Sequence, residues 1–129
     1  MSEPETIVIK ADVREVREAR DFVGLVFGAW GLTDYVARTV VSELATNAVV
    51  HGSEDGDTVI VRAYRKDDGI PVVEAWDRSD DLPVIKAVNY GIESGRGLLL
   101  LQGLVRRWGT RPLNEGGKVV WAEIEPVRA

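Results

Sequence analysis

The stretch VSELATNAVVHG, residues 41–52, decides the fold of this chain. Its polar side chains Glu43, Asn47 and His51 recur every four residues within an otherwise apolar run. Because an α-helix has 3.6 residues per turn, this spacing places all three on one stripe of a helix. A neighbouring stripe is apolar and can anchor the helix to a core: Val40, Leu44 and Ala48. The stretch therefore predicts a largely buried helix with one polar stripe.

The polar stripe has two interpretations. A Glu and an Asn four residues apart on a helix often form only its solvated edge. A carboxylate and an amide beside a core are costly, however, unless water, a metal or a ligand satisfies them. Glu43 and Asn47 are therefore candidate residues of a cleft. His51 precedes Gly52 and is interpreted as structural, because the helix dipole favours a basic residue in the last turn and glycine commonly ends helices.

Composition restricts the class of protein. The chain has 129 residues, of which 45% are hydrophobic and 29% charged, and this is typical of one globular domain, with a core over about 6–125. Its 16 basic and 21 acidic residues give a net charge of −5 without a basic stripe, so no direct nucleic-acid binding is expected. The absence of cysteine excludes disulfides and thiolate metal sites. No apolar run of spanning length and no signal peptide occur, so we expect a cytoplasmic protein without a membrane partner.

Hydrophobic periodicity predicts both helices and strands. Strands are expected at 6–11, 58–65, 72–76, 107–112 and 118–124. Helices are expected from Val13 to Ala29 with Asp12 as the N-cap, from the cap residue Thr33 to His51, and over 98–105. This order lacks strict strand–helix alternation. It predicts an α+β fold, a two-layer α/β sandwich with a mixed, mostly antiparallel sheet and helices on one face.

Two further segments carry candidate ligand-binding groups. Asp77 directly follows the strand 72–76, where a carboxylate either caps the next turn or accepts a hydrogen bond from an exocyclic amine. Gly95 and Gly97 precede a predicted helix, where the backbone can approach a phosphate and the helix N-terminus can bind it. This G-x-G does not follow a strand in a βαβ unit. A dinucleotide-binding interpretation therefore fails, and no P-loop motif is present.

Taken together, these segments resemble the ATP-binding (Bergerat) domain shared by DNA gyrase, the ninety-kilodalton heat-shock chaperones, sensor histidine kinases and mismatch-repair proteins, the GHKL superfamily. The Glu43-x-x-x-Asn47 helix resembles its N box, Asp77 the aspartate of its first glycine box, and Gly95-Arg96-Gly97 its second. The likeness covers residues 10–125. The phrases SELATNA and SGRGL resemble most closely the bacterial anti-sigma-factor serine kinases and their stand-alone regulatory relatives.

The resemblance implies a role for each residue. Asn47 would bind Mg²⁺ through its side-chain oxygen, and the metal would bridge the triphosphate of ATP. Glu43 would be the general base that deprotonates a partner's serine hydroxyl or a water. Asp77 would accept the adenine amine, and so select ATP over GTP. The backbone of the second glycine box would hold the phosphates: Gly95, Arg96, Gly97 and Leu98.

Other features of the resemblance concern charge and closure. Arg96 or Lys86 would pair with the phosphates, and residues 82–94 would form a lid over the nucleotide. One departure lies in the first glycine box, which normally reads Asp-x-Gly-x-Gly. Here residues 77–81 read Asp-Arg-Ser-Asp-Asp, without glycine, although the carboxylate that reads adenine is kept.

The leading hypothesis is an ATP-binding anti-sigma-type serine kinase that binds a sigma factor or similar client and phosphorylates an antagonist protein. The glycine-free box favours an alternative, a catalytically weak binding module regulated by nucleotide. A histidine kinase fragment is disfavoured because the single histidine lies in the N-box helix, and a ligand-free structural protein is the residual alternative. The first helix also carries more apolar residues than one core stripe needs: Phe22, Val26, Phe27 and Trp30. Core packing is the expected use of these side chains, and a homodimer or client-binding face is the alternative.

Overall fold

The computed structural model describes residues 2–79 and 101–129 of the chain. Its elements in chain order are β1 (Glu5–Lys10), η1 (Val13–Glu15), α1 (Val16–Ala29), α2 (Tyr35–Gly52), β2 (Thr58–Arg65), β3 (Pro71–Asp77), β4 (Arg107–Pro112) and β5 (Lys118–Glu123). Residues 101–104 are also helical, within the helix predicted over 98–105. Every strand and helix predicted within the described ranges is present, with bounds shifted by a few residues.

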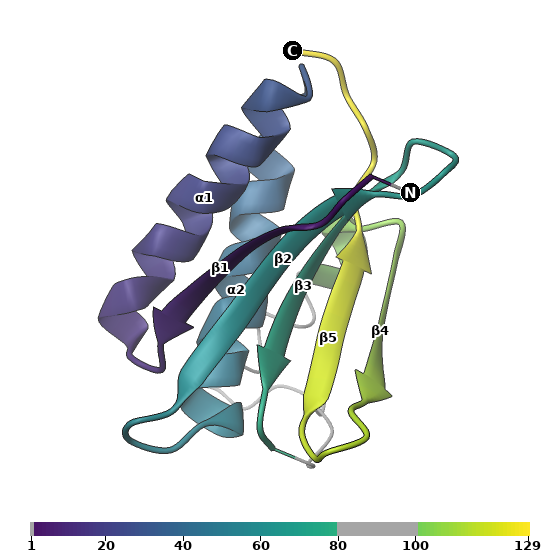
Figure 1. The fold of residues 1–129 in the computed structure, drawn as a ribbon. Coiled ribbons are helices and arrows are strands. Elements are labelled where there is room, and N and C mark those ends of the chain that lie inside the picture. The colour runs from purple at the N-terminus through teal and green to yellow at the C-terminus, as the bar shows by residue number, and fades with distance from the viewer. Residues whose placement is uncertain (1, 80–100) are drawn as a thin grey trace.

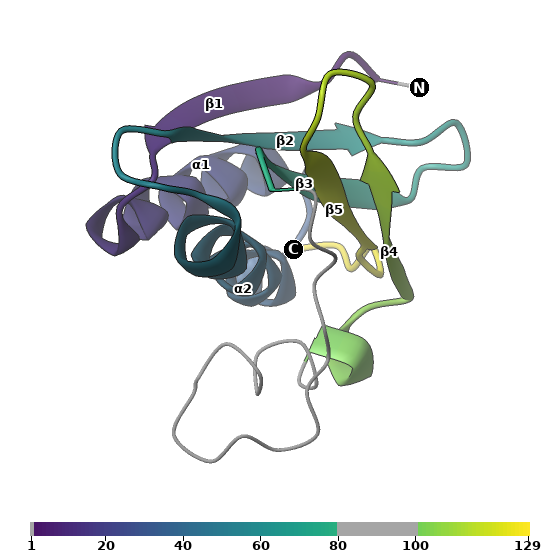
Figure 2. The same cartoon turned by 90° about the horizontal axis from the view of Figure 1, so that it is seen from below.

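The strands form one sheet in the order β1-β2-β3-β5-β4. Within the described residues, each neighbouring pair is antiparallel. Figures 1 and 2 show α1 and α2 side by side on the same face of this sheet. The predicted α+β sandwich of two layers is therefore confirmed.

The core lies between the helices and the inner face of the sheet. Alternate residues of the central strands point inward and are buried, as period-two patterning requires: Val59, Val61, Ala63, Val73 and Ala75. The predicted apolar stripe of α2 packs against them: Val40, Leu44 and Ala48 are each at most 3% exposed. Burial of this apolar surface is the main term that stabilises the fold and fixes α2 over β3.

Two predicted helix caps differ from the structure. Asp12 caps the short helix η1, where its carboxylate accepts a hydrogen bond from the backbone N–H of Arg14, and α1 begins only at Val16. The prediction that Thr33 caps α2 is wrong, because Asp34 occupies the N-cap position without a capping side-chain bond. The N–H of Thr33 instead donates to the carbonyl oxygen of Val127 at 2.7 Å, which ties this segment to the C-terminal residues.

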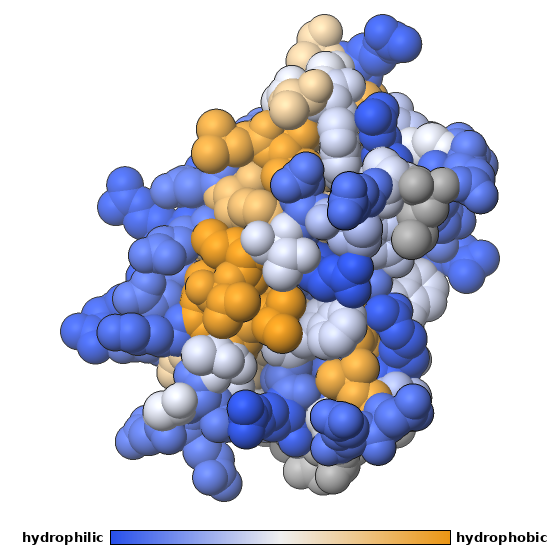
Figure 3. Space-filling model, in the orientation of Figure 1, coloured by the Kyte–Doolittle hydropathy of each residue, from blue (hydrophilic) through white to orange (hydrophobic). Residues whose placement is uncertain are grey.

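The outer face of the sheet bears a buried carboxylate. Glu74 on β3 is 1% exposed and accepts hydrogen bonds from the Tyr64 hydroxyl at 3.0 Å and the Trp76 indole N–H at 2.9 Å. Arg111 and Arg62 pair with the same carboxylate. Figure 3 shows this face, where hydrophilic side chains surround an apolar patch over β1 and β2.

No helix in the described part of the chain is long and apolar enough to cross a membrane.

Candidate functional site

The predicted polar stripe lies on α2. Glu43 and Asn47 are half-buried there, one turn apart. The Asn47 Nδ2 atom is fully buried and has no hydrogen-bond partner in the described structure. A buried polar group without a partner costs free energy, and native proteins rarely leave one unsatisfied. The Nδ2 atom of Asn47 is therefore suited to donate a hydrogen bond to a bound ligand.

Asp77 ends β3 directly beside the end of the same helix. Its carboxylate lies so close to the α-carbon of Gly52 that a β-carbon at position 52 would overlap it. A β-carbon on Gly117 would likewise overlap the carbonyl oxygen of Asp77, and Gly117 also has a φ of +89°. Both glycines therefore permit a close approach that any other residue would prevent.

Two of the three loci predicted from the sequence are thus brought together. Gly52 follows Asn47 by five residues, which corresponds to roughly 7.5 Å along the helix axis at a 1.5 Å rise per residue. Because Gly52 contacts Asp77, the carboxylate of β3 lies near the C-terminal half of the polar stripe. The arrangement places an amide and a carboxylate at one end of the sandwich, where α2 packs on β3.

Asp77 has a charged partner that sequence reasoning missed. Its Oδ1 atom accepts hydrogen bonds from the Nζ of Lys118 at 3.0 Å and from the backbone N–H of Ser79 at 2.9 Å. The side chains of Lys118 and Asp77 are only 7% and 2% exposed. Burial raises the pKa of Asp77, while the hydrogen bonds from Lys118 and Ser79 oppose that rise. The available sequence signal is a lysine that follows two glycines and precedes the apolar run 119–122.

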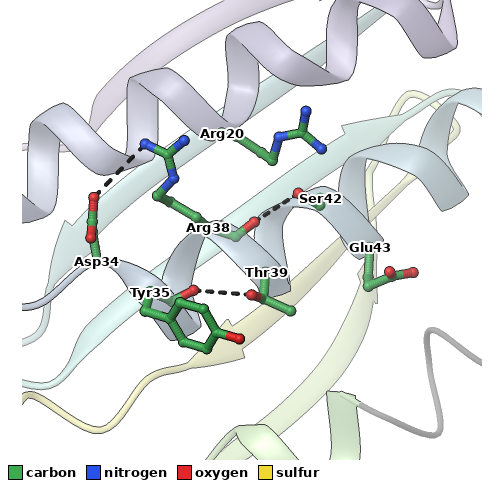
Figure 4. A pocket seen from close by; sticks show the side chains of 7 residues that line it. All are labelled: Arg20, Asp34, Tyr35, Arg38, Thr39, Ser42 and Glu43. Atoms are coloured by element: carbon green, nitrogen blue, oxygen red, sulfur yellow. Dashed lines mark hydrogen bonds and ion pairs between the residues drawn. The ribbon is translucent and has the colours of Figure 1, made fainter.

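Glu43 borders a surface depression of about 530 Å³. Figure 4 shows the residues that line it, from Arg20 on α1 along the first turns of α2 to Glu43. Two guanidinium groups face it, and Arg38 is held by Asp21 at 3.5 Å and by Asp34 at 3.8 Å. The lining therefore has mixed charge, and it includes Glu43, which the sequence identifies as a candidate base.

The remaining predicted site residues belong to the segment 80–100. The second glycine box, Gly95, Arg96, Gly97 and Leu98, lies outside the described residues, as do Lys86 and the predicted lid over 82–94. Within 2–79 and 101–129, no cluster of three or more His, Asp or Glu side chains could cage a metal ion. A metal bound to Asn47 would therefore take few ligands from this part of the chain, as Mg²⁺ does when phosphates and waters complete its shell.

Comparison with known proteins identifies the family. The profile described as the histidine kinase-like ATPase domain matches residues 9–124. The chain belongs to this family. The match covers α2, β3 and β5, and with them Asn47, Asp77 and Lys118. The GHKL assignment made from the three sequence segments is therefore confirmed, and ATP binding is the property that this family membership implies.

Solved structures show the same fold at low sequence identity. The structure of the RsbU and RsbW domains of Rv1364c from Mycobacterium tuberculosis matches with a TM-score of 0.71 and 19% identity, over 99% of this chain and 34% of that one. The histidine kinase domain of the blue-light activated kinase EL346 from Erythrobacter litoralis matches with a TM-score of 0.52 and 19% identity, over 90% of this chain and 61% of that one. The chain thus spans about a third and about three fifths of these structures. No curated protein matches it.

Proposed function

We propose that this chain binds ATP with Mg²⁺ and transfers a phosphoryl group to a serine of a partner protein. The observation that carries the proposal is the buried Nδ2 atom of Asn47, which has no hydrogen-bond partner in the described structure and lies on the same helix whose end contacts Asp77. The unpartnered Nδ2 is a hydrogen-bond donor and fits a phosphate oxygen of a nucleotide, while the carboxylate between the two glycines fits the exocyclic amine of its base. Bound Mg·ATP supplies the phosphoryl group and the charge that neutralises the phosphates.

The residues of the nucleotide site have distinct roles. The Asn47 side-chain oxygen is the metal ligand, because amide oxygens are hard donors of the kind that Mg²⁺ accepts. Asp77 accepts a hydrogen bond from the exocyclic amine of adenine. The backbone of residues 95–98 and the cationic side chain of Arg96 hold the phosphates. Together these groups position the nucleotide, which is the larger part of catalysis in phosphoryl transfer.

Glu43 acts on the acceptor. As the general base it takes the proton of the serine hydroxyl while that oxygen is aligned with the γ-phosphorus. The depression that ends at Glu43 is where the acceptor segment lies, since it is open along α2 and lined by Arg20 and Arg38.

The partner is an antagonist protein of the anti-sigma type, and the client is a sigma factor or a similar regulator. The support is the sequence phrases SELATNA and SGRGL together with the fold shared with the RsbU and RsbW domain structure. Phosphotransfer to a candidate antagonist protein tests this partner.

The decisive experiment incubates the pure chain with Mg·ATP and candidate antagonist proteins encoded near it, and measures phosphoserine. Glu43→Gln should lower the rate of transfer by about 10²–10⁴-fold, as loss of a general base does, and should keep the thermal shift caused by Mg·ATP. Glu54→Gln changes an exposed glutamate just past α2 and is the matched control. Transfer that is unchanged in Glu43→Gln, or a chain that binds no ATP, would overturn the proposal.

A second function is favoured by the first glycine box, which lacks glycine, and by the engagement of Asp77 with Lys118. In this alternative, ATP occupancy only sets the affinity for a partner protein. It predicts a partner Kd that changes with Mg·ATP while no phosphoserine forms. Measurement of both quantities on the same sample separates the two functions.

A further inference from the structure

Lys118 is the buried cation of the candidate nucleotide site. It is the first residue of β5 and lies directly opposite Asp77 in the β3–β5 register, so the sheet fixes its position. Its Nζ atom donates to Asp77 Oδ1 at 3.0 Å, and both side chains are almost fully buried. An ammonium has three N–H donors, and this bond uses one of them. The end of the sheet therefore offers a hydrogen-bond acceptor and a donor side by side.

We propose that Lys118 reads the base of the bound nucleotide, so that Asp77 accepts from the adenine amine N6 while Lys118 donates to adenine N1. The inference deepens the proposed ATP site and rests on it. The exocyclic amine N6 is bonded to C6, next to the ring nitrogen N1, so a donor and an acceptor lie side by side on this edge of adenine. The Asp77–Lys118 pair has the complementary order, acceptor then donor.

Guanine has the opposite order at the same two positions. Its O6 is an acceptor and its N1 carries a hydrogen, so O6 would face the Asp77 carboxylate and N1–H would face the Lys118 ammonium. Both contacts would be unfavourable, and buried polar groups left without partners give strong discrimination between ligands. An aspartate alone rejects guanine at one position, whereas the Asp77–Lys118 pair rejects it at two.

Because Lys118 is buried, a hydrogen bond from a second N–H of its ammonium group would strengthen ligand binding. A buried ion pair is costly unless its remaining donors and acceptors are satisfied. Adenine N1 would satisfy a further N–H of Lys118 and so add a charge-assisted hydrogen bond that forms only in the complex. Lys66, by contrast, is a half-exposed lysine that pairs with Asp68 and Glu123 away from Asp77. It is the matched control for a loss of lysine charge.

The test measures binding of Mg·ATP and Mg·1-deaza-ATP, in which N1 is replaced by C–H, by titration calorimetry. The wild-type chain should bind ATP at least about tenfold more tightly than the analogue, since a hydrogen bond to a charged group corresponds to about one to two powers of ten in affinity. Lys118→Met should bind both nucleotides with equal, weakened affinity, and Lys66→Met should behave as wild type. Lys118→Gln retains a neutral donor and should show a reduced preference.

Each outcome decides a different point. Equal binding of ATP and 1-deaza-ATP by the wild-type chain overturns the role of Lys118 and leaves the ATP site standing. An undiminished preference in Lys118→Met does the same. A wild-type chain that binds neither nucleotide overturns the proposed function together with this inference. The wild-type comparison needs no variant, so the test holds even if Lys118→Met fails to fold.

Discussion

Gly52, in the last turn of α2, faces the carboxylate of Asp77 with no room for a methyl group between them. Gly52 is buried and belongs to the helix, so its small size matters here for packing. The contact joins the helix that bears Asn47 to the strand that ends in Asp77. A change at this single α-carbon therefore tests whether the two elements form one site.

Gly52→Ala should separate Asp77 from α2. We expect the added methyl group to displace the carboxylate, to lower the free energy of unfolding by about 1–3 kcal/mol as overpacking does, and to abolish the thermal shift with Mg·ATP. Gly28→Ala in α1 is the matched control, since a β-carbon there meets no atom within 4 Å. That variant should gain about 0.5–1 kcal/mol from helix propensity. Equal thermal stability and equal ATP shifts in the two variants would contradict the packing argument.

Asn47→Leu should raise the stability of the free chain and remove its response to the metal. The substitution replaces an amide whose buried Nδ2 atom lacks a partner with an apolar group of similar size, so we expect about 1 kcal/mol of added unfolding free energy. It also deletes the proposed magnesium ligand, so the ATP-dependent thermal shift should no longer depend on Mg²⁺. Calorimetric melts with ATP, with and without Mg²⁺, measure both effects. A destabilised variant that keeps its Mg²⁺ response would refute the role of this amide.

Local pattern was sufficient to predict most of the fold. The four-residue recurrence of Glu43 and Asn47 and the neighbouring apolar stripe depend only on helix geometry, and the structure places them as predicted. The position of Asp77 at the end of a strand followed from strand patterning, and its role from a family resemblance. Helices and strands depend mainly on residues that are close together in the sequence, so they could be predicted without the structure.

Contacts between distant residues could not be predicted in the same way. Lys118 pairs with Asp77 across 41 residues, and only the register of β5 against β3 sets them opposite each other. Thr33 is a residue type that commonly caps helices, but its backbone N–H donates a hydrogen bond to the C-terminal segment. No local sequence signal shows that the C-terminal segment lies beside Thr33. Gly52 was expected to end a helix, and its packing role depends on the side chain of Asp77 at the far end of β3. These features require the tertiary arrangement.

The cap at Asp12 should give a measurable dependence of stability on pH. Hydrogen bonds from the Arg14 side chain and backbone lower the pKa of Asp12 to about 2 from its usual value of 3.8. Because the folded pKa is the lower one, the charged cap stabilises the fold above pH 3.8, and this contribution is lost as pH falls toward 2. Asp12→Asn keeps a capping oxygen without the charge. The difference in Tm between wild type and Asp12→Asn should therefore be larger at pH 6 than at pH 2, and a constant difference would contradict the lowered pKa.

The network around Glu74 predicts a raised pKa for the Tyr64 hydroxyl. Burial, the negative charge of Glu74 and the hydrogen bond to it raise the pKa of Tyr64 to about 12. The neutral phenol donates to the carboxylate at 3.0 Å, so ionisation would place two negative charges together. The contribution of this phenol to stability is complete below its usual pKa of 10 and is lost as pH rises through about 12.

An alkaline titration followed by the ultraviolet absorbance of phenolate should show this late step, and Tyr64→Phe should lack it. Glu74→Gln retains an acceptor but removes the charge, so it should move the step toward lower pH while burial keeps it above the usual value. Circular dichroism recorded in parallel establishes that the fold persists through the titration. A Tyr64 that ionises near pH 10 in the folded chain, or a step that Glu74→Gln leaves unmoved, would show that the carboxylate does not control this phenol.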